Sequence, residues 1–283
     1  MVKNNDNLKG KRWNQGLTLV SVINIFIITY YYFSKHNLNK FSKKLTILVM
    51  IYTYVCAIRG IYPRIEDSGL CAYDNTISKP IIGRTLATVA ELSFVMFFVL
   101  LTKTFLKDIF KINNNTNLLG LKKINNVLFP LIILAQIFCW IGSITKDTQW
   151  NALEESLWAI FALVKVVIYS FMYYNIYKIS NNKLTNPIKL LKMLIPFIVI
   201  FMSVYFLYIV CIDVPLYIKK SKNYKGKLNS LFQGLKELSL CRVVTFSYKK
   251  WKNEMPWLTL YFTLAVWFAI FMLIFYNDYY SKV

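Results

Sequence analysis

The sequence predicts an all-α, polytopic integral membrane protein with seven transmembrane helices in one bundle. The 283 residues are 57% hydrophobic and 17% charged, whereas a soluble domain is about half apolar and about a quarter charged. The apolar residues gather in seven stretches, each about long enough to cross the hydrocarbon core of a bilayer. Little of the chain remains outside these stretches, so a single domain over residues 1–283 is expected.

The predicted spans are apolar runs bounded by polar or basic residues. The first is interpreted as a membrane helix and not as a cleaved signal peptide, because its apolar run is too long and no small-residue cleavage site follows it. The second is the weakest, because Ser42, Lys43 and Lys44 shorten its apolar core. In chain order the spans are residues 17–33, 41–59, 82–106, 127–144, 155–177, 192–214 and 256–276.

The loop between the sixth and seventh spans carries a further helical pattern. Apolar residues recur there at helical spacing, which predicts a short amphipathic helix that lies on the membrane before the last span. These residues are Leu228, Leu231, Phe232, Leu235 and Leu238.

Seven spans place the two ends of the chain on opposite faces of the membrane. The face that holds the N-terminus, called side A, also holds the loops 60–81, 145–154 and 215–255, and the opposite face is called side B. The positive-inside rule counts lysine and arginine in short loops. Side B has 14 of these residues, whereas side A has 9 without the 215–255 loop and 19 with it. The rule therefore gives opposite answers with and without that loop.

The cysteines supply a second argument about orientation. Cys71 and Cys241 are the two cysteines outside the spans, and both fall on side A. A disulfide between them would clamp the loop 60–81 to the loop 215–255 and would require an oxidising compartment. Two unrelated free thiols are the alternative. The disulfide favours an exoplasmic or lumenal N-terminus and a cytoplasmic C-terminus.

What the sequence lacks excludes several functional classes. The net charge of +21 lies in the loops, where lysine and arginine meet lipid headgroups, so nucleic-acid binding is not expected. His36 is the one histidine, and no cysteines or acids have zinc-ligand spacing, so no metal site is expected. The 9 glycines are scattered and form no phosphate-binding loop. No cofactor is expected, and the expected partners are membrane lipids and a small solute or lipid ligand.

The candidate site is a set of polar residues in or near the side-A half of the spans. A charge near the end of a span can extend to the interface, so each residue also has a purely structural interpretation. The set is interpreted as a binding site because its members converge on one face of the membrane. They are Arg59, Arg84, Glu91, Glu154, Glu155, Lys165, Asp213 and Glu254.

Glu91 and Lys165 lie deepest within their spans, the third and the fifth. A charge at the centre of a membrane costs about 2.5–3.5 kcal/mol and usually faces the interior of the bundle with a partner. We therefore predict that spans three and five pack together, with Glu91 facing Lys165 directly or through a water. Arg84 shares a helix face with Glu91, but about 10 Å separates them along the axis, which predicts that these two residues do not pair.

Three functional hypotheses follow from this pattern. The first is a polar intramembrane site, open to the face of the N-terminus, that binds or transports a small solute or lipid. The second is a metal-free membrane enzyme that uses carboxylate and lysine acid–base chemistry on an amphiphilic substrate. The third is a receptor-like or assembly protein without a cavity, in which the polar residues fix helix packing.

Overall fold

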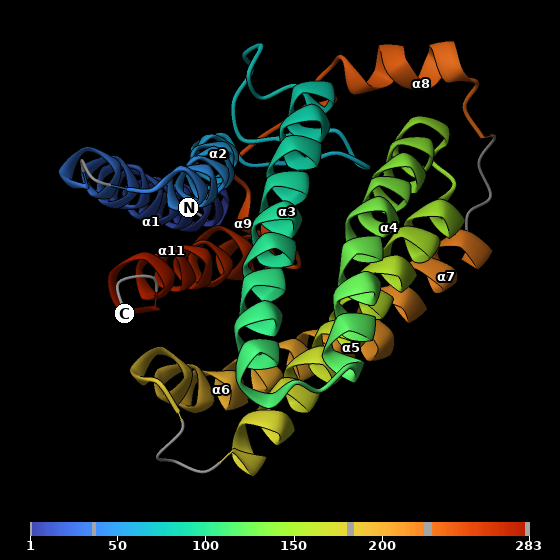
Figure 1. Ribbon diagram of the computed structural model, residues 1–283. Helices are drawn as coiled ribbons and strands as arrows, with labels where there is room; N and C mark the ends of the chain where they lie inside the picture. The colour runs from blue at the N-terminus through green and yellow to red at the C-terminus, as the bar shows by residue number, and fades with distance from the viewer. Residues whose placement is uncertain (1, 36–37, 180–183, 224–227, 281–283) are drawn as a thin grey trace. The chain divides into compact units, whose positions relative to one another are not determined.

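The computed structural model describes residues 2–35, 38–179, 184–223 and 228–280, and His36 lies outside them. Within these residues, 7 helices are long and apolar enough to cross a membrane (Figure 1). The prediction of an all-α, seven-span membrane protein is confirmed.

Five of the spans are uninterrupted helices, and two contain π-helical turns. The uninterrupted ones are α1 (Val2–Ser34), α2 (Lys40–Ile61), α3 (Pro80–Asn113), α4 (Asn117–Thr145) and α5 (Thr148–Lys178). The sixth runs through α6 (Asn186–Tyr208), the π-helical turn η2 (Ile209–Asp213) and α7 (Val214–Asn223). The seventh comprises α10 (Met255–Leu260), η3 (Tyr261–Ala265), α11 (Val266–Ile274) and η4 (Phe275–Tyr280).

The sixth helix differs from the sequence prediction at its C-terminal end. The predicted span ends at residue 214, whereas the helix continues to Asn223. Pro215 has no N–H and clashes with the carbonyl four residues earlier, so it normally ends or kinks a helix. That earlier residue, Cys211, lies in η2, where a π-helical turn alters the backbone spacing. Asp213 is therefore inside a continuous helix and not at its end.

Contacts between Cα atoms divide the chain into two compact units, and each is described by itself. Unit 1 comprises Met1–Phe94, Ser143–Lys146 and Asn229–Leu273. Unit 2 comprises Val95–Gly142, Asp147–Leu228 and Ile274–Val283. The α3 helix contributes its first half to unit 1 and its second half to unit 2. The single domain over residues 1–283 stays a prediction.

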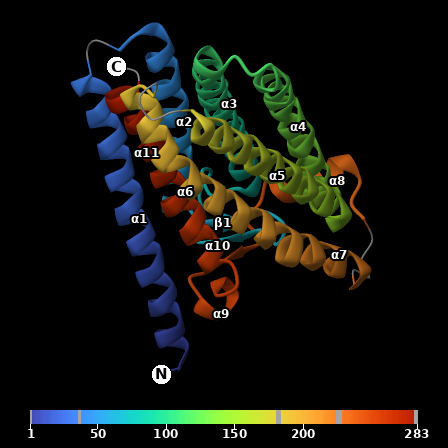
Figure 2. The ribbon, with the colours of Figure 1, turned by 60° about the horizontal axis from the view of Figure 1, so that its bottom comes forward.

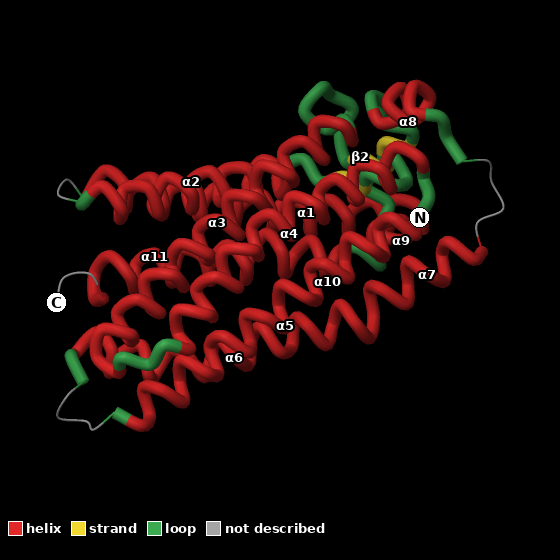
Figure 3. The backbone as a smooth tube through the Cα atoms, turned by 45° about the vertical axis from the view of Figure 1, so that its right-hand side comes forward, coloured by secondary structure: helices red, strands yellow, loops and turns green. Residues whose placement is uncertain are grey.

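In unit 1, α1 lies beside α2 and also packs against η3 and the short helix α9 (Tyr248–Trp251) (Figures 1 and 2). A small sheet joins the loop 60–81 to the loop 215–255. Its strands, in order, are β1 (Arg64–Ile65), β2 (Leu70–Cys71) and β3 (Val243–Val244) (Figure 3). The β1–β2 pair is antiparallel and the β2–β3 pair is parallel.

A disulfide reinforces this sheet. Cys71 in β2 is bonded to Cys241, two residues before β3, and the two Cα atoms are 5.8 Å apart. This separation falls within the range of about 4.4–6.8 Å that disulfides adopt. The bond links the two loops that the sequence assigns to side A.

The short helix predicted before the last span is present as α8 (Leu231–Leu238). Its backbone rests on the end of α4, because a Cβ on Gly234 would lie 2.1 Å from the carbonyl oxygen of Ile144. Lys146 and Arg242 donate to the Glu237 carboxylate, and the Lys146 hydrogen bond is the main reason why the pKa of Glu237 is lowered. Phe232 is 81% exposed. The position of α8 on the membrane surface stays a prediction.

In unit 2, α5 packs against α6, η2 and α7 (Figure 3). The α5 helix begins at Thr148, because the carboxylate of Asp147 accepts the amide of Gln149 at 3.0 Å and caps the first turn. The helix therefore starts about two turns before the predicted span 155–177. As a result, Glu154 and Glu155 lie inside α5.

The topology can be tested with a tag at each end of the full-length protein. Seven crossings are expected to place the two tags on opposite faces of the membrane. Antibody or protease access before and after permeabilisation of cells measures this directly. Protection of both tags on the same face would rule out seven crossings.

Candidate functional site

The structure divides the predicted site between the two units. Half of the predicted residues belong to unit 1, namely Arg59, Arg84, Glu91 and Glu254. The other half belong to unit 2, namely Glu154, Glu155, Lys165 and Asp213.

In unit 1, Arg59 at the end of α2 and Arg84 at the start of α3 each form an ion pair. Arg59 Nη2 lies 3.4 Å from Glu66 Oε1, and Arg84 Nη2 lies 3.5 Å from Glu91 Oε1. These four side chains are only 9–16% exposed. Arg59 also interacts electrostatically with Arg84 and Glu91, so the two pairs belong to one group of charges. Together with Arg64, these residues are called the arginine cluster.

The prediction that Arg84 and Glu91 do not pair is wrong. It treated the separation of about 10 Å along the helix axis as the distance between the charges. Helical side chains, however, tilt toward the N-terminus of the helix. Glu91 therefore extends back toward Arg84, and the long arginine side chain covers the remaining distance.

Arg64 and Glu66 complete the cluster, although the predicted site does not include them; the sequence marks Arg64 only as a polar residue beside the end of the second span. The Arg64 side chain is 3% exposed, and its Nη1 donates to the carbonyl oxygens of Ile77 and Lys79. Burial lowers the pKa of the Arg64 guanidinium to about 10. In the sequence both residues stand in a polar loop segment, YPRIED, which carries no sign of burial. The small sheet and its disulfide fold this segment against the start of α3.

Gly83 in the first turn of α3 makes this burial possible. A Cβ at Gly83 would lie 2.4 Å from Arg64 Cδ and 2.9 Å from Glu66 Oε1. No side chain fits in that space, so only glycine lets Arg64 and Glu66 lie directly against the helix backbone.

Glu254, the fourth predicted residue in unit 1, stands at the N-cap of α10. Its carbonyl oxygen accepts the amide of Leu258 at 2.9 Å, so its backbone begins the helix of the last span. Glu254 is half-buried.

In unit 2, Lys165 on α5 is fully buried, with 0% exposure. Its Nζ donates to Thr102 Oγ1 at 2.8 Å, to Asn125 Oδ1 at 2.8 Å and to the Phe98 carbonyl at 3.2 Å. Asn125 is held in place because its own amide donates to the Val99 carbonyl at 2.9 Å. Lys165, Thr102 and Asn125 are called the lysine cradle.

The lysine cradle joins α3, α4 and α5. All three acceptors of the ammonium group are uncharged, and they match its three N–H donors. The bonds to α3 link the two spans that the sequence prediction placed side by side. Glu91 belongs to unit 1 and Lys165 to unit 2. The pairing of these two side chains stays a prediction.

The remaining residues of unit 2 lie along α5 and η2. Glu154 in α5 is 7% exposed, and Glu155 beside it is half-buried. Asp213 ends η2, which packs against α5, and it is also half-buried.

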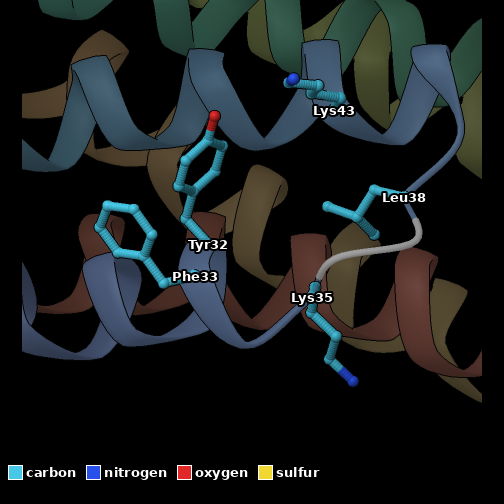
Figure 4. A pocket seen from close by; sticks show the side chains of 5 residues that line it. All are labelled: Tyr32, Phe33, Lys35, Leu38 and Lys43. Carbon is cyan, nitrogen blue, oxygen red and sulfur yellow. The ribbon is translucent and has the colours of Figure 1, made fainter.

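A hollow of about 220 Å³ lies in unit 1 between the end of α1 and the start of α2 (Figure 4). Arg59 is at the opposite end of α2, so the hollow does not belong to the arginine cluster. The hollow is lined by Tyr32, Phe33, Lys35, Leu38 and Lys43. Among the described residues, no group of three or more histidine, cysteine, aspartate or glutamate side chains is arranged to hold a metal ion.

The fold defines an α-helical, multi-pass membrane protein. Comparison with protein-family models, with curated proteins and with solved structures gives no match.

Proposed function

We propose that the protein binds or transports a small solute or lipid at the arginine cluster of unit 1. The observation that carries this proposal is the gathering of three guanidinium groups and two carboxylates, none more than 16% exposed, around the end of α2 and the first turns of α3. Ionisable residues inside or at the edge of a membrane are expensive to bury, and they commonly mark substrate sites. Membrane lipids and the bound ligand are the proposed partners.

The other two hypotheses have less support. A general acid or base exchanges a proton with its substrate, but Glu66 and Glu91 each face a guanidinium and the three donors of Lys165 all have acceptors. A purely structural role suits the lysine cradle, because its polar groups satisfy one another. The arginine cluster differs, because its three guanidinium groups and two carboxylates have a net positive charge.

We further propose that side A faces the exoplasm or a lumen, with the N-terminus there and the C-terminus in the cytoplasm. The Cys71–Cys241 bond supports this orientation, because disulfides persist in oxidising compartments. The arginine cluster lies against the same disulfide-linked loops, so its ligand would enter from that face.

Native mass spectrometry of the full-length protein, extracted in mild detergent, tests the binding proposal. The wild type is expected to carry a co-purifying small molecule, which the double variant Arg84→Gln/Glu91→Gln loses. The double variant removes both members of an ion pair, so neither charge is left buried without its partner. Lys44→Gln, an exposed cation on α2, is the matched control and should keep the bound molecule. A wild type without any bound molecule, or a double variant with normal occupancy, would refute the proposal.

A further inference from the structure

Arg64 has hydrogen-bond donors that no group in the described part of the chain satisfies. Its Nη1 is used, but among the described residues neither Nε nor Nη2 has an acceptor. The side chain is 97% buried, given its 3% exposure. A buried polar group without a partner is destabilising, and more so when it is charged. Such a group in a native structure requires an explanation, and a bound ligand is one.

The free edge of Arg64 faces the start of a long helix. A Cβ on Gly83, in the first turn of α3, would lie 2.7 Å from Arg64 Nε. The amides of Ile81 and Ile82 stand in the same turn, where N–H groups have no acceptor within the helix. This end of the helix also carries the positive pole of the helix dipole and therefore favours anions.

Ser78, two residues before α3, supplies a second polar group of the same kind. Its side chain is 0% exposed, and its Oγ has no hydrogen-bond partner among the described residues. Arg64 Nη1 donates to the carbonyl oxygens on either side of Ser78, those of Ile77 and Lys79. The unsatisfied hydroxyl of Ser78 therefore belongs to the segment that holds the Arg64 guanidinium.

The arginine cluster also contains one more cation than it has carboxylates. The carboxylate that acts on Arg64 is Glu66, which is already paired with Arg59. Arg84 and Glu91 balance each other. A bound monoanion would neutralise the remaining cation, and Nε and Nη2 are the two parallel donors with which arginine holds carboxylate and phosphate oxygens.

We infer that the ligand of the arginine cluster is an anion, a carboxylate or phosphate group bound by Arg64 Nε and Nη2 and Ser78 Oγ at the N-terminus of α3. The inference rests on the proposed function and names the chemistry of its ligand. The anionic group belongs either to a small solute or to a lipid headgroup.

The test measures the unfolding temperature of the full-length protein in neutral detergent at constant ionic strength. One arm titrates inorganic phosphate or acetate, and the other adds phosphatidylglycerol, with phosphatidylcholine as the neutral comparison. We expect saturable stabilisation of the wild type by phosphate or acetate if the source is a free anion. Stabilisation by phosphatidylglycerol alone would identify a lipid headgroup. An unfolding temperature that responds to neither kind of anion would overturn the inference.

Three variants test whether the stabilisation by anions depends on Arg64 and Ser78. Arg64→Lys keeps the charge but not the parallel donors, and its anion affinity should fall about tenfold or more. Ser78→Ala removes an unsatisfied hydroxyl without adding bulk, so it should fold normally and weaken anion binding several-fold. Lys252→Gln changes an exposed cation of the loop 215–255 and should respond like the wild type. Formation of the Cys71–Cys241 bond reports that each variant has folded.

The outcomes separate this inference from the proposed function. Wild-type anion affinity in both Arg64→Lys and Ser78→Ala would overturn the inference. If the wild type still carried a molecule that Arg84→Gln/Glu91→Gln loses, the proposed binding function would stand and its ligand would not be this anion. If the wild type neither carried a molecule nor responded to an anion, both proposals would fall.

Discussion

Replacing Asn125 with alanine is expected to lower the free energy of unfolding by about 2–3 kcal/mol. Asn125 Oδ1 accepts a hydrogen bond from the fully buried ammonium of Lys165, and the substitution leaves that charged donor without its acceptor. It also removes the bond that ties α4 to the Val99 carbonyl on α3. Thermal unfolding of the purified protein in detergent measures the effect.

Two further variants show whether the unpaired donor is the cause. Asn126→Ala changes an exposed neighbour on the same helix and should leave the unfolding temperature unchanged. Asn125→Ala/Lys165→Met removes both partners, and it should be more stable than Asn125→Ala alone because no buried charge lacks an acceptor. An Asn125→Ala protein as stable as the wild type would contradict the structure of the lysine cradle.

Breaking the Cys71–Cys241 disulfide is expected to lower the free energy of unfolding by about 2–4 kcal/mol. The bond joins residues 170 positions apart in the sequence and holds β2 beside β3, so its loss frees the segment that buries Arg64. Cys71→Ser should therefore lower both the unfolding temperature and the anion response. A reducing agent should have the same effect on the wild type.

The matched control for the disulfide is Cys211→Ser, which removes an exposed free thiol. This variant should unfold like the wild type. Comparison of reducing and non-reducing gels after thiol blocking shows whether the bond forms in cells. If the thiol-blocking reagent alkylated Cys71 in cells, this result would contradict both the bond and the proposed orientation.

The sequence predicted the membrane class and the number of spans because hydropathy and length are local properties of the chain. It predicted the ends of the helices less well. Hydropathy marks the part of a helix that crosses hydrocarbon, whereas α3 continues to Asn113, seven residues past the predicted span 82–106. In the sixth span, the helix continues past Pro215 because of the π-helical turn η2, and no periodic pattern in the sequence predicts such a turn.

The candidate site was only partly predictable for physical reasons. Glu91 was identified by its depth in the third span and Arg84 by its position at the start of that span, but their pairing was missed because backbone rise ignores the length and direction of side chains. Arg64 and Glu66 were not included in the predicted site because their burial depends on a loop that folds back through long-range strand pairing. The partners of Lys165 were not predicted because a buried charge indicates a partner of opposite charge, whereas Thr102 and Asn125 are neutral.

An experimental density map of the full-length protein in lipid nanodiscs, at a resolution that shows side chains, tests the central claim most directly. We expect non-protein density the size of a carboxylate or phosphate group, within hydrogen-bond distance of Arg64 Nε and Nη2 and of the first turn of α3. The Arg59–Glu66 and Arg84–Glu91 pairs should flank this density. A map in which protein oxygens fill that edge of Arg64, or in which the site holds water alone, would contradict the proposed anion site.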